Sequence, residues 1–268
     1  MFAASRRRVA VVALAALALA GCASRSTSIP VSEPVATTTL LARLGADTVA
    51  VEQFTRTARH MDGTLVTRLP ATRVTRYSVD LGPSGAPVRA DVSVRDGRGA
   101  PLPGGLQSLS VRFARDSATF VGHRSASDTS QAFAVRGPVL PSLPMSYGLY
   151  ELALARMSFF GRDSVAFESV PLVFGTRGAT PQSVRVVSRD SVRIVVDGGP
   201  LFVRHDRVGR IVGVDGSRTT FNVQVERVDS LDLESIARAW GAREQEGGRT
   251  GQASTRDTTR ASLPLSPQ

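Results

Sequence analysis

A strict alternation of apolar and polar residues is the feature that most limits what this chain can fold into. In residues 88–95 the apolar side chains fall on one side and the polar ones on the other, and Leu109, Val111 and Phe113 repeat the pattern, as do residues 223–226. Successive side chains of a strand point to opposite faces of a sheet. The pattern therefore predicts half-buried strands of an antiparallel sheet.

Short acidic turns precede several of these strands. The pairs are Asp47-Thr48, Asp116-Ser117, Asp163-Ser164 and Asp190-Ser191. An aspartate side chain accepts hydrogen bonds from backbone N–H groups nearby, which favours a turn. Turns and alternation together predict a mainly β (α+β) fold with a curved antiparallel sheet or half-barrel of about ten strands.

Two segments change to helical spacing. Apolar residues recur three and four positions apart from Tyr150 to Met157, and Gly161 ends the segment. Leu233, Ile236, Ala237 and Trp240 form a second stripe, for which Ser230 is the predicted N-cap. These are predicted to be amphipathic helices packed on the sheet. The alternative is that the same stripes line a cavity for an apolar ligand.

The start of the chain predicts export. Basic residues 6–8 precede an apolar segment from Val9 to Ala20, which is shorter than the roughly 20 residues needed to cross a bilayer. Leu19-Ala20-Gly21-Cys22 matches the lipobox of bacterial lipoproteins, and Cys22 is the one cysteine of the chain. The alternatives are a signal peptide without lipidation and an uncleaved membrane helix.

The resemblance to bacterial lipoproteins implies that residues 1–21 are a cleaved signal peptide and that Cys22 is lipidated. It places the protein in the cell envelope, with the membrane as its partner. Ala23 follows the cysteine in place of an inner-membrane retention aspartate, which favours the outer membrane, facing the periplasm. A single cysteine also excludes an internal disulfide, so the fold is held by its core.

Composition divides the remaining chain into three parts. Residues 22–39 are rich in Ser, Thr and Pro and are predicted to be a flexible tether. Residues 40–245 are predicted to form a single β-rich domain, and residues 246–268 a disordered tail with too little apolar surface to fold.

All the positively charged Lys and Arg positions of the chain are arginine. The sequence has 33 arginines and no lysine, which excludes lysine nucleophiles and Schiff bases. Its net charge of +10 becomes +7 when the three arginines of residues 1–21 are removed (10 − 3). The arginines are spread along the chain with no basic stripe, so we expect no nucleic-acid partner.

No motif of catalysis, metal binding or cofactor binding is found in the sequence. His60, His123 and His205 are far apart and lack a second ligand at metal spacing. We therefore predict no catalytic residues, no metal and no cofactor. An undetected hydrolase stays open as a third alternative, in which two of these histidines meet with Asp206 or another carboxylate in one cleft.

The lipobox, the tether, the long antiparallel meander and the mid-chain helix together resemble periplasmic half-barrel domains of the LolA and LolB lipoprotein-carrier type. This resemblance implies a non-enzymatic lipoprotein whose curved sheet binds a hydrophobic ligand or acyl chain. The predicted lining residues are aromatic or apolar and lie in or near the helices: Met145, Tyr147, Tyr150, Leu154, Phe159, Phe160 and Trp240. The alternative is a structural or interaction module that docks an envelope protein through a sheet edge.

Overall fold

The computed structural model describes residues 36–124, 127–176 and 178–260, without the side chains of Phe160 and residues 247–260. These residues belong to one unit, Val35–Gln268. The predicted signal peptide, the lipobox with Cys22, and the tether before residue 36 lie outside the described residues. So does the end of the predicted tail, after residue 260.

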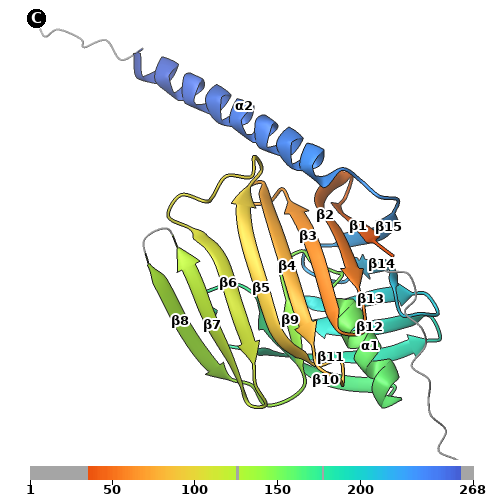
Figure 1. The fold of residues 1–268 in the computed structure, drawn as a ribbon. Helices are drawn as coiled ribbons and strands as arrows, with labels where there is room; N and C mark the ends of the chain where they lie inside the picture. Colours follow the sequence, from red (N-terminus) through yellow and green to blue (C-terminus); the bar gives the residue numbers. More distant parts are fainter. Residues whose placement is uncertain (1–35, 125–126, 177, 261–268) are drawn as a thin grey trace, which may run out of the picture. The chain divides into compact units, whose positions relative to one another are not determined.

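Within the described residues, fifteen strands form one hydrogen-bonded sheet, so the prediction of about ten strands is wrong. The prediction of a mainly β fold with a large antiparallel sheet and two helices is confirmed (Figure 1). Some of the additional strands lack clean alternation: β8 has Phe133 as its one large apolar residue, and β9 contains Pro141. The strands are β1 (Thr38–Leu44), β2 (Asp47–Arg56), β3 (His60–Thr67), β4 (Arg73–Leu81), β5 (Pro87–Asp96), β6 (Leu106–Phe113), β7 (Ser117–Arg124), β8 (Asp128–Ala134), β9 (Val139–Ser142), β10 (Ser164–Pro171), β11 (Thr180–Ser188), β12 (Ser191–Val196), β13 (Gly199–His205), β14 (Ile211–Gly216) and β15 (Val223–Val228).

The predicted acidic turns lie where strands begin. β2 starts at Asp47, and the serines after the other three aspartates start β7, β10 and β12. Three of these turns are hairpin corners, whereas Asp163 lies between a helix and β10. The local chemistry of Asp-Ser and Asp-Thr therefore marks strand starts in all four places.

The first and the last strand of the sheet are neighbours at its centre. β1 pairs with β2 on one side and with β15, the last strand, on the other. From β1 the chain runs through neighbouring hairpins to β8 at one edge, crosses to β9 at the other edge, and returns through β10–β15. All neighbours are antiparallel except β9 and β10.

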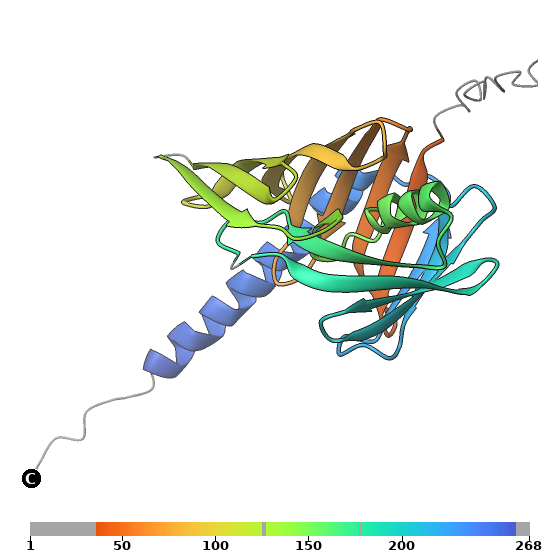
Figure 2. The same cartoon turned by 90° about the horizontal axis from the view of Figure 1, so that it is seen from below.

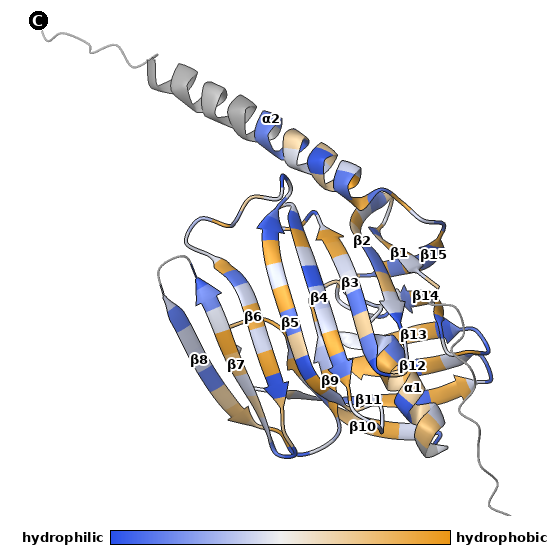
Figure 3. Ribbon diagram, viewed as in Figure 1, coloured by the Kyte–Doolittle hydropathy of each residue, from blue (hydrophilic) through white to orange (hydrophobic). Residues whose placement is uncertain are grey.

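The sheet curls, so that it has an inner and an outer face. Along strands such as β4–β7 apolar and polar residues alternate in Figure 3. The apolar side chains point inward and join one large buried cluster, to which both halves of the sheet and the first helix contribute. Figure 2 shows this helix inside the curl, between the two halves of the sheet. The inner face therefore holds the core.

Helix α1 (Tyr150–Phe160) confirms the first predicted helix. Gly161 follows it with φ 58°, a left-handed conformation that glycine adopts without strain, and the backbone carbonyls of Met157 and Ser158 are capped there. Leu152 and Ala153 are buried completely in the core. The predicted apolar stripe thus packs against the inner face of the sheet.

Helix α2 (Leu233–Arg260) lies on the outer face. Its N-cap is Asp232, which accepts a hydrogen bond from the backbone N–H of Ser235 (3.0 Å), so the prediction of Ser230 as the cap is wrong. Ser230 instead accepts a hydrogen bond from Gln53 of β2 (3.0 Å). The helix continues through residues 246–260, for which the composition predicts a disordered tail. Neither α1 nor α2 combines the length and the apolar character needed to cross a membrane.

Candidate functional site

A buried carboxylate fixes the turn that leads into α1. Glu52 of β2 accepts hydrogen bonds from Tyr77 Oη (2.7 Å) and Ser146 Oγ (2.5 Å). The backbone N–H groups of Tyr147 and Gly148 also donate to it, each at 2.8 Å. Burial raises the pKa of the Glu52 carboxyl, although these four hydrogen bonds oppose the rise. Four donors converge on Glu52, so its role is to position the turn.

A second buried carboxylate ties α1 to both halves of the sheet. Glu151 accepts hydrogen bonds from Arg56 Nε of β2 (3.0 Å) and from the backbone N–H of Ile211 in β14 (2.9 Å). Burial raises the pKa of Glu151, and the Arg56 guanidinium opposes this rise. A charged residue inside an apolar stripe was the sequence signal for such a role, but its partners are 95 and 60 residues away.

A hollow lies beside the C-terminal half of this helix, and we call it the α1 hollow. Its volume is about 1170 Å³. Leu154 and Met157 of α1, Val186 of β11 and Val192 of β12 give it apolar walls, and Val208 lies in the turn between β13 and β14. Val186 and Val208 are 38% and 54% exposed, so apolar surface is open to the solvent here. A concave site with apolar side chains in its walls suits a small ligand with an apolar part.

Charged residues of both signs surround the α1 hollow. Three arginines and three aspartates line it, so these charges cancel (3 − 3 = 0): Arg162, Arg189, Arg207, Asp163, Asp190 and Asp206. Partial burial would raise the pKa of Asp206, but hydrogen bonds from the Arg210 backbone N–H and the Arg227 side chain hold it below its ordinary value. The rim therefore does not select for net charge, and the apolar walls determine what fits.

The predicted lining residues do not all meet at one site. Leu154 lines the α1 hollow, whereas Tyr147 and Tyr150 lie together, with ring centroids 6.5 Å apart, against the core. Met145 also packs against the core, and Phe159 is 63% exposed. The side chain of Phe160 is outside the described residues. Trp240 packs on the outer face with Val51 and Val66. The valines of the hollow went unpredicted because Val186 and Val192 of the β11–β12 hairpin meet Val208 and α1 only in the folded protein.

The three histidines lie in different places. His60 contacts Asp62 (2.8 Å) and Asp80 (2.7 Å) on β3 and β4, and His123 contacts Asp128 (2.8 Å) across β7 and β8. His205 lines the α1 hollow with Asp206. Within the described ranges no group of three His, Cys, Asp or Glu side chains is arranged to hold a metal ion. The hydrolase alternative needs two of these histidines in one cleft, which the described residues do not provide.

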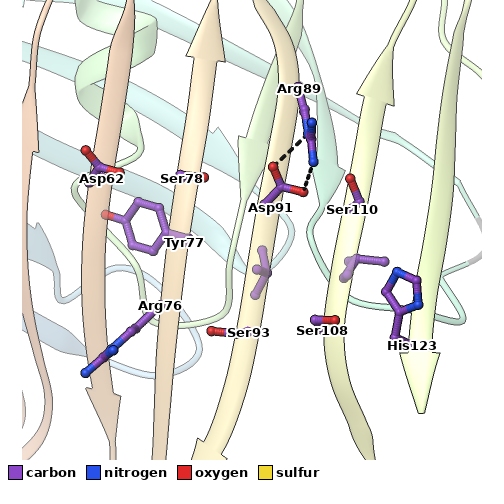
Figure 4. A pocket seen from close by; sticks show the side chains of 12 residues that line it. Asp62, Arg76, Tyr77, Ser78, Arg89, Asp91, Ser93, Ser108, Ser110 and His123 are labelled. Atoms are coloured by element: carbon purple, nitrogen blue, oxygen red, sulfur yellow. Dashed lines mark hydrogen bonds and ion pairs between the residues drawn. The ribbon is translucent and has the colours of Figure 1, made fainter.

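A polar hollow of about 440 Å³ lies on the outer face of β3–β7 (Figure 4). Ser93 and Ser108 stand opposite each other on β5 and β6, and their short side chains leave room between longer ones. Arg89 and Asp91 form a two-point ion pair along β5 beside this space, with contacts of 2.7 and 3.0 Å. We call this the serine hollow. Most of its lining side chains are polar, although Val92 and Leu109 also contribute to it.

Comparison with known proteins finds similar structures and no match by sequence. No family model and no curated protein matches the sequence. A DUF1089 family protein from Pseudomonas aeruginosa is similar with a TM-score of 0.47 and 11% identity, over 64% of this chain and 91% of that one. A β-barrel-like protein of the domain of unknown function DUF1849 from Brucella abortus has a TM-score of 0.43 and 11% identity, over 73% and 99%. Neither name states a ligand or an activity.

Proposed function

We propose that this protein is a non-enzymatic envelope lipoprotein, anchored through Cys22, that binds the acyl chain of an amphipathic lipid in the α1 hollow. The observation that carries the proposal is the hollow itself, with about 1170 Å³ beside α1 and the apolar side chains of Leu154, Met157 and Val192 in its walls. Each methylene group moved from water into such a site contributes about 0.8 kcal/mol.

Binding is tested with matched valine pairs on the full chain carrying Cys22→Ala. Val186→Glu with Val208→Glu places carboxylates in the α1 hollow, whereas Val187→Glu with Val195→Glu changes exposed valines outside its lining. A fluorescent analogue of palmitic acid should bind about tenfold more weakly to the first variant, since roughly 1.5 kcal/mol of apolar contact is lost. The second variant should bind it like the parent. Equal binding by all three proteins, or no binding by the parent, contradicts the proposal.

The anchor is tested separately. Two acyl chains on one residue hold a protein stably at a bilayer, whereas a chain without them partitions into water. Protein from its native host should carry an acyl mass at Cys22 and enter the detergent phase of a phase separation, and Cys22→Ala should move it to the aqueous phase. An unmodified Cys22 would overturn the anchor and leave the binding experiment unaffected.

The edge of the sheet at β8 favours a second candidate, a docking module. β9, at the other edge, is buried, lies against β5, and receives a hydrogen bond from Arg156 at Val139 O (3.1 Å). β8 is the last strand of the sheet order, contains no proline, and has a single charged residue, Asp128, at its start, so little blunts this edge. If an envelope protein adds a strand to this edge, Ala132→Arg on β8 should abolish its binding. Thr119→Arg on the neighbouring β7 should leave its binding unchanged. Crosslinking to the same partner in both variants would contradict this candidate.

A further inference from the structure

Helix α2 is docked on a row of apolar side chains that crosses the outer face. Leu41, Val51, Val66 and Val74 stand directly opposite one another on β1–β4. Leu233 and Ala237 of α2 are buried on Val51 and Val66, while Leu41 and Val74 pack at their sides. The first turns of α2 are therefore fixed against the sheet, and the side chains next to this row have defined neighbours.

The backbone of α2 also closely approaches the turn that follows β5. A Cβ atom on Gly97 would lie 2.8 Å from the carbonyl oxygen of Ala237 and 3.2 Å from Cα of Gly241. Contacts this short are not tolerated, so glycine is required for the approach. The helix and the turn thus form two fixed walls at the end of β3–β5.

Between these walls lies a hollow of about 350 Å³ that we call the arginine groove. Its arginines come from three elements: Arg76 from β4, Arg95 and Arg98 from β5 and its turn, and Arg238 from α2. Arg76 stands opposite Ser93 and Arg95 opposite Val74, so these two arginines are diagonal neighbours on one face. Thr64 and Ser93 add hydroxyl groups to the lining.

The arginine groove has an excess of positive charge that the other two hollows lack. Four arginines face one carboxylate, Glu234, which gives +3 (4 − 1). Glu234 lies 3.9 Å from Arg76, a long contact between exposed side chains. Asp96 is close in sequence, but its carboxylate accepts hydrogen bonds from the backbone N–H groups of Arg98 and Ala100. The serine hollow has two arginines and two aspartates, and the α1 hollow has three of each.

We propose that the arginine groove binds a phosphate ester. A guanidinium group donates hydrogen bonds in a planar fork that matches the oxygens of a phosphate. A phosphate bound among several arginines also offsets the repulsion between their positive charges. Arg76 and Ser93 line both the arginine groove and the serine hollow, so the two are adjacent. Figure 4 shows Arg76 and Ser93 at one side of the serine hollow, which extends from them toward Ser108 and His123. The ligand thus carries a phosphate at the arginines and a hydroxylated group over the serines.

The first experiment measures glycerol phosphate binding by calorimetry, with the full chain carrying Cys22→Ala at low salt. Arg98→Ser with Arg238→Ser removes two groove arginines and should weaken binding at least tenfold, because each removes a charge-assisted hydrogen bond. Arg185→Ser with Arg193→Ser removes two exposed arginines that stand opposite each other on β11 and β12, away from the groove. This control should bind like the parent. An equal loss in both variants would show a general charge effect and overturn the proposal.

The second experiment looks for a gain of affinity, which misfolding cannot produce. Glu234→Gln removes the one carboxylate that lines the groove and should tighten glycerol phosphate binding by roughly threefold, since its exposed contact with Arg76 is weak. Glu226→Gln is the matched control, because Glu226 pairs with Arg43 (2.9 Å) at an exposed place elsewhere on the outer face. Weaker binding by Glu234→Gln, or the same change in the control, would contradict the site.

Two further arms identify the source of the phosphate and separate this site from the α1 hollow. Competition by dihexanoyl phosphatidic acid, stronger than by glycerol phosphate itself, assigns a lipid head group, and equal competition assigns a free phosphate ester. Val186→Glu with Val208→Glu should leave glycerol phosphate binding unchanged. A parent protein that binds neither phosphate compound overturns the arginine groove, whatever the outcome with palmitic acid.

Discussion

The polar side chains on the inner face of β2–β4 are buried and hydrogen-bonded, whereas those on the outer face line an open hollow. On the inner face Glu52 and Tyr77 are buried, and Tyr77 Oη donates to Glu52 at 2.7 Å. Ser78, the residue after Tyr77 on β4, lies on the outer face and lines the serine hollow. One strand therefore presents a structural hydrogen-bond network on one side and an open polar surface on the other. The difference teaches that burial, more than residue type, decides whether a polar side chain stabilises the fold or is free to meet a ligand.

The comparison predicts that Glu52→Ala is the most destabilising change. It leaves four buried donors without their acceptor, and each such group costs about 1–3 kcal/mol, with a total of roughly 3–5 kcal/mol because the effects do not add. Glu226→Ala, which breaks an exposed ion pair with Arg43, should cost about 0–1 kcal/mol. Urea unfolding of the three proteins gives both numbers. Similar costs for the two variants would contradict the assigned role of Glu52.

A smaller effect is expected for Val66→Thr, which tests the apolar row beneath α2. Val66 is completely buried although it points to the outer face, so a hydroxyl there has no water and costs about 1–3 kcal/mol. Val121→Thr is the same change on the outer face of β7, at a residue 36% exposed, and should stay within about 0.5 kcal/mol. Thermal unfolding of the two variants distinguishes them. If Val121→Thr costs as much, burial under α2 is not the cause.

Tyr77→Phe should cost roughly 1 kcal/mol, because it removes one of the four donors to Glu52 and keeps the ring. Its neighbour Ser78 points to the opposite face, and Ser78→Ala should change the stability by less than about 0.5 kcal/mol. The two variants therefore compare the two faces at adjacent positions of one strand. A larger cost for Ser78→Ala in chemical denaturation would reverse the comparison.

The smallest effect at neutral pH is expected for Glu52→Gln. The amide can accept from the N–H groups of Tyr147 and Gly148 and donate to the hydroxyl groups of Tyr77 and Ser146, which rotate to accept. The variant differs from the parent in pH dependence. Because the folded pKa of Glu52 is raised above 4.5, the folded state binds more protons, and stability present below pH 4.5 is lost as the pH rises through the folded pKa.

Unfolding free energies of Glu52→Gln and its parent, measured below pH 4.5 and at neutral pH, check this expectation. The parent should lose more stability between the two conditions than the variant does. Glu151 shifts in the same direction, but it is present in both proteins and cancels in the difference. A steeper loss in the variant would mean that the pKa of Glu52 is lowered in the folded protein.

Elements defined by local pattern could be predicted from the sequence. The alternation of residues 88–95 and 109–113 became β5 and β6, and the stripe before Gly161 became α1. Strand β9 was missed because it is a strand only through its pairing with β10. The cap at Asp232 was missed although it is local, three residues before Ser235. The consecutive apolar residues Leu65 and Val66 were an available sign that both faces of β3 are covered.

The candidate sites depended on the tertiary structure to a greater degree. Val186 and Val192 of the β11–β12 hairpin meet Leu154 of α1 and Val208 of the β13–β14 turn at the α1 hollow. The groove arginines come from β4, the end of β5 and α2. The sequence by itself determined the mainly β class, the position of α1, and the prediction of a lipidated Cys22. Only the tertiary structure decided which polar groups are bonded and which hollows form, because these depend on the register between strands that are distant in the chain.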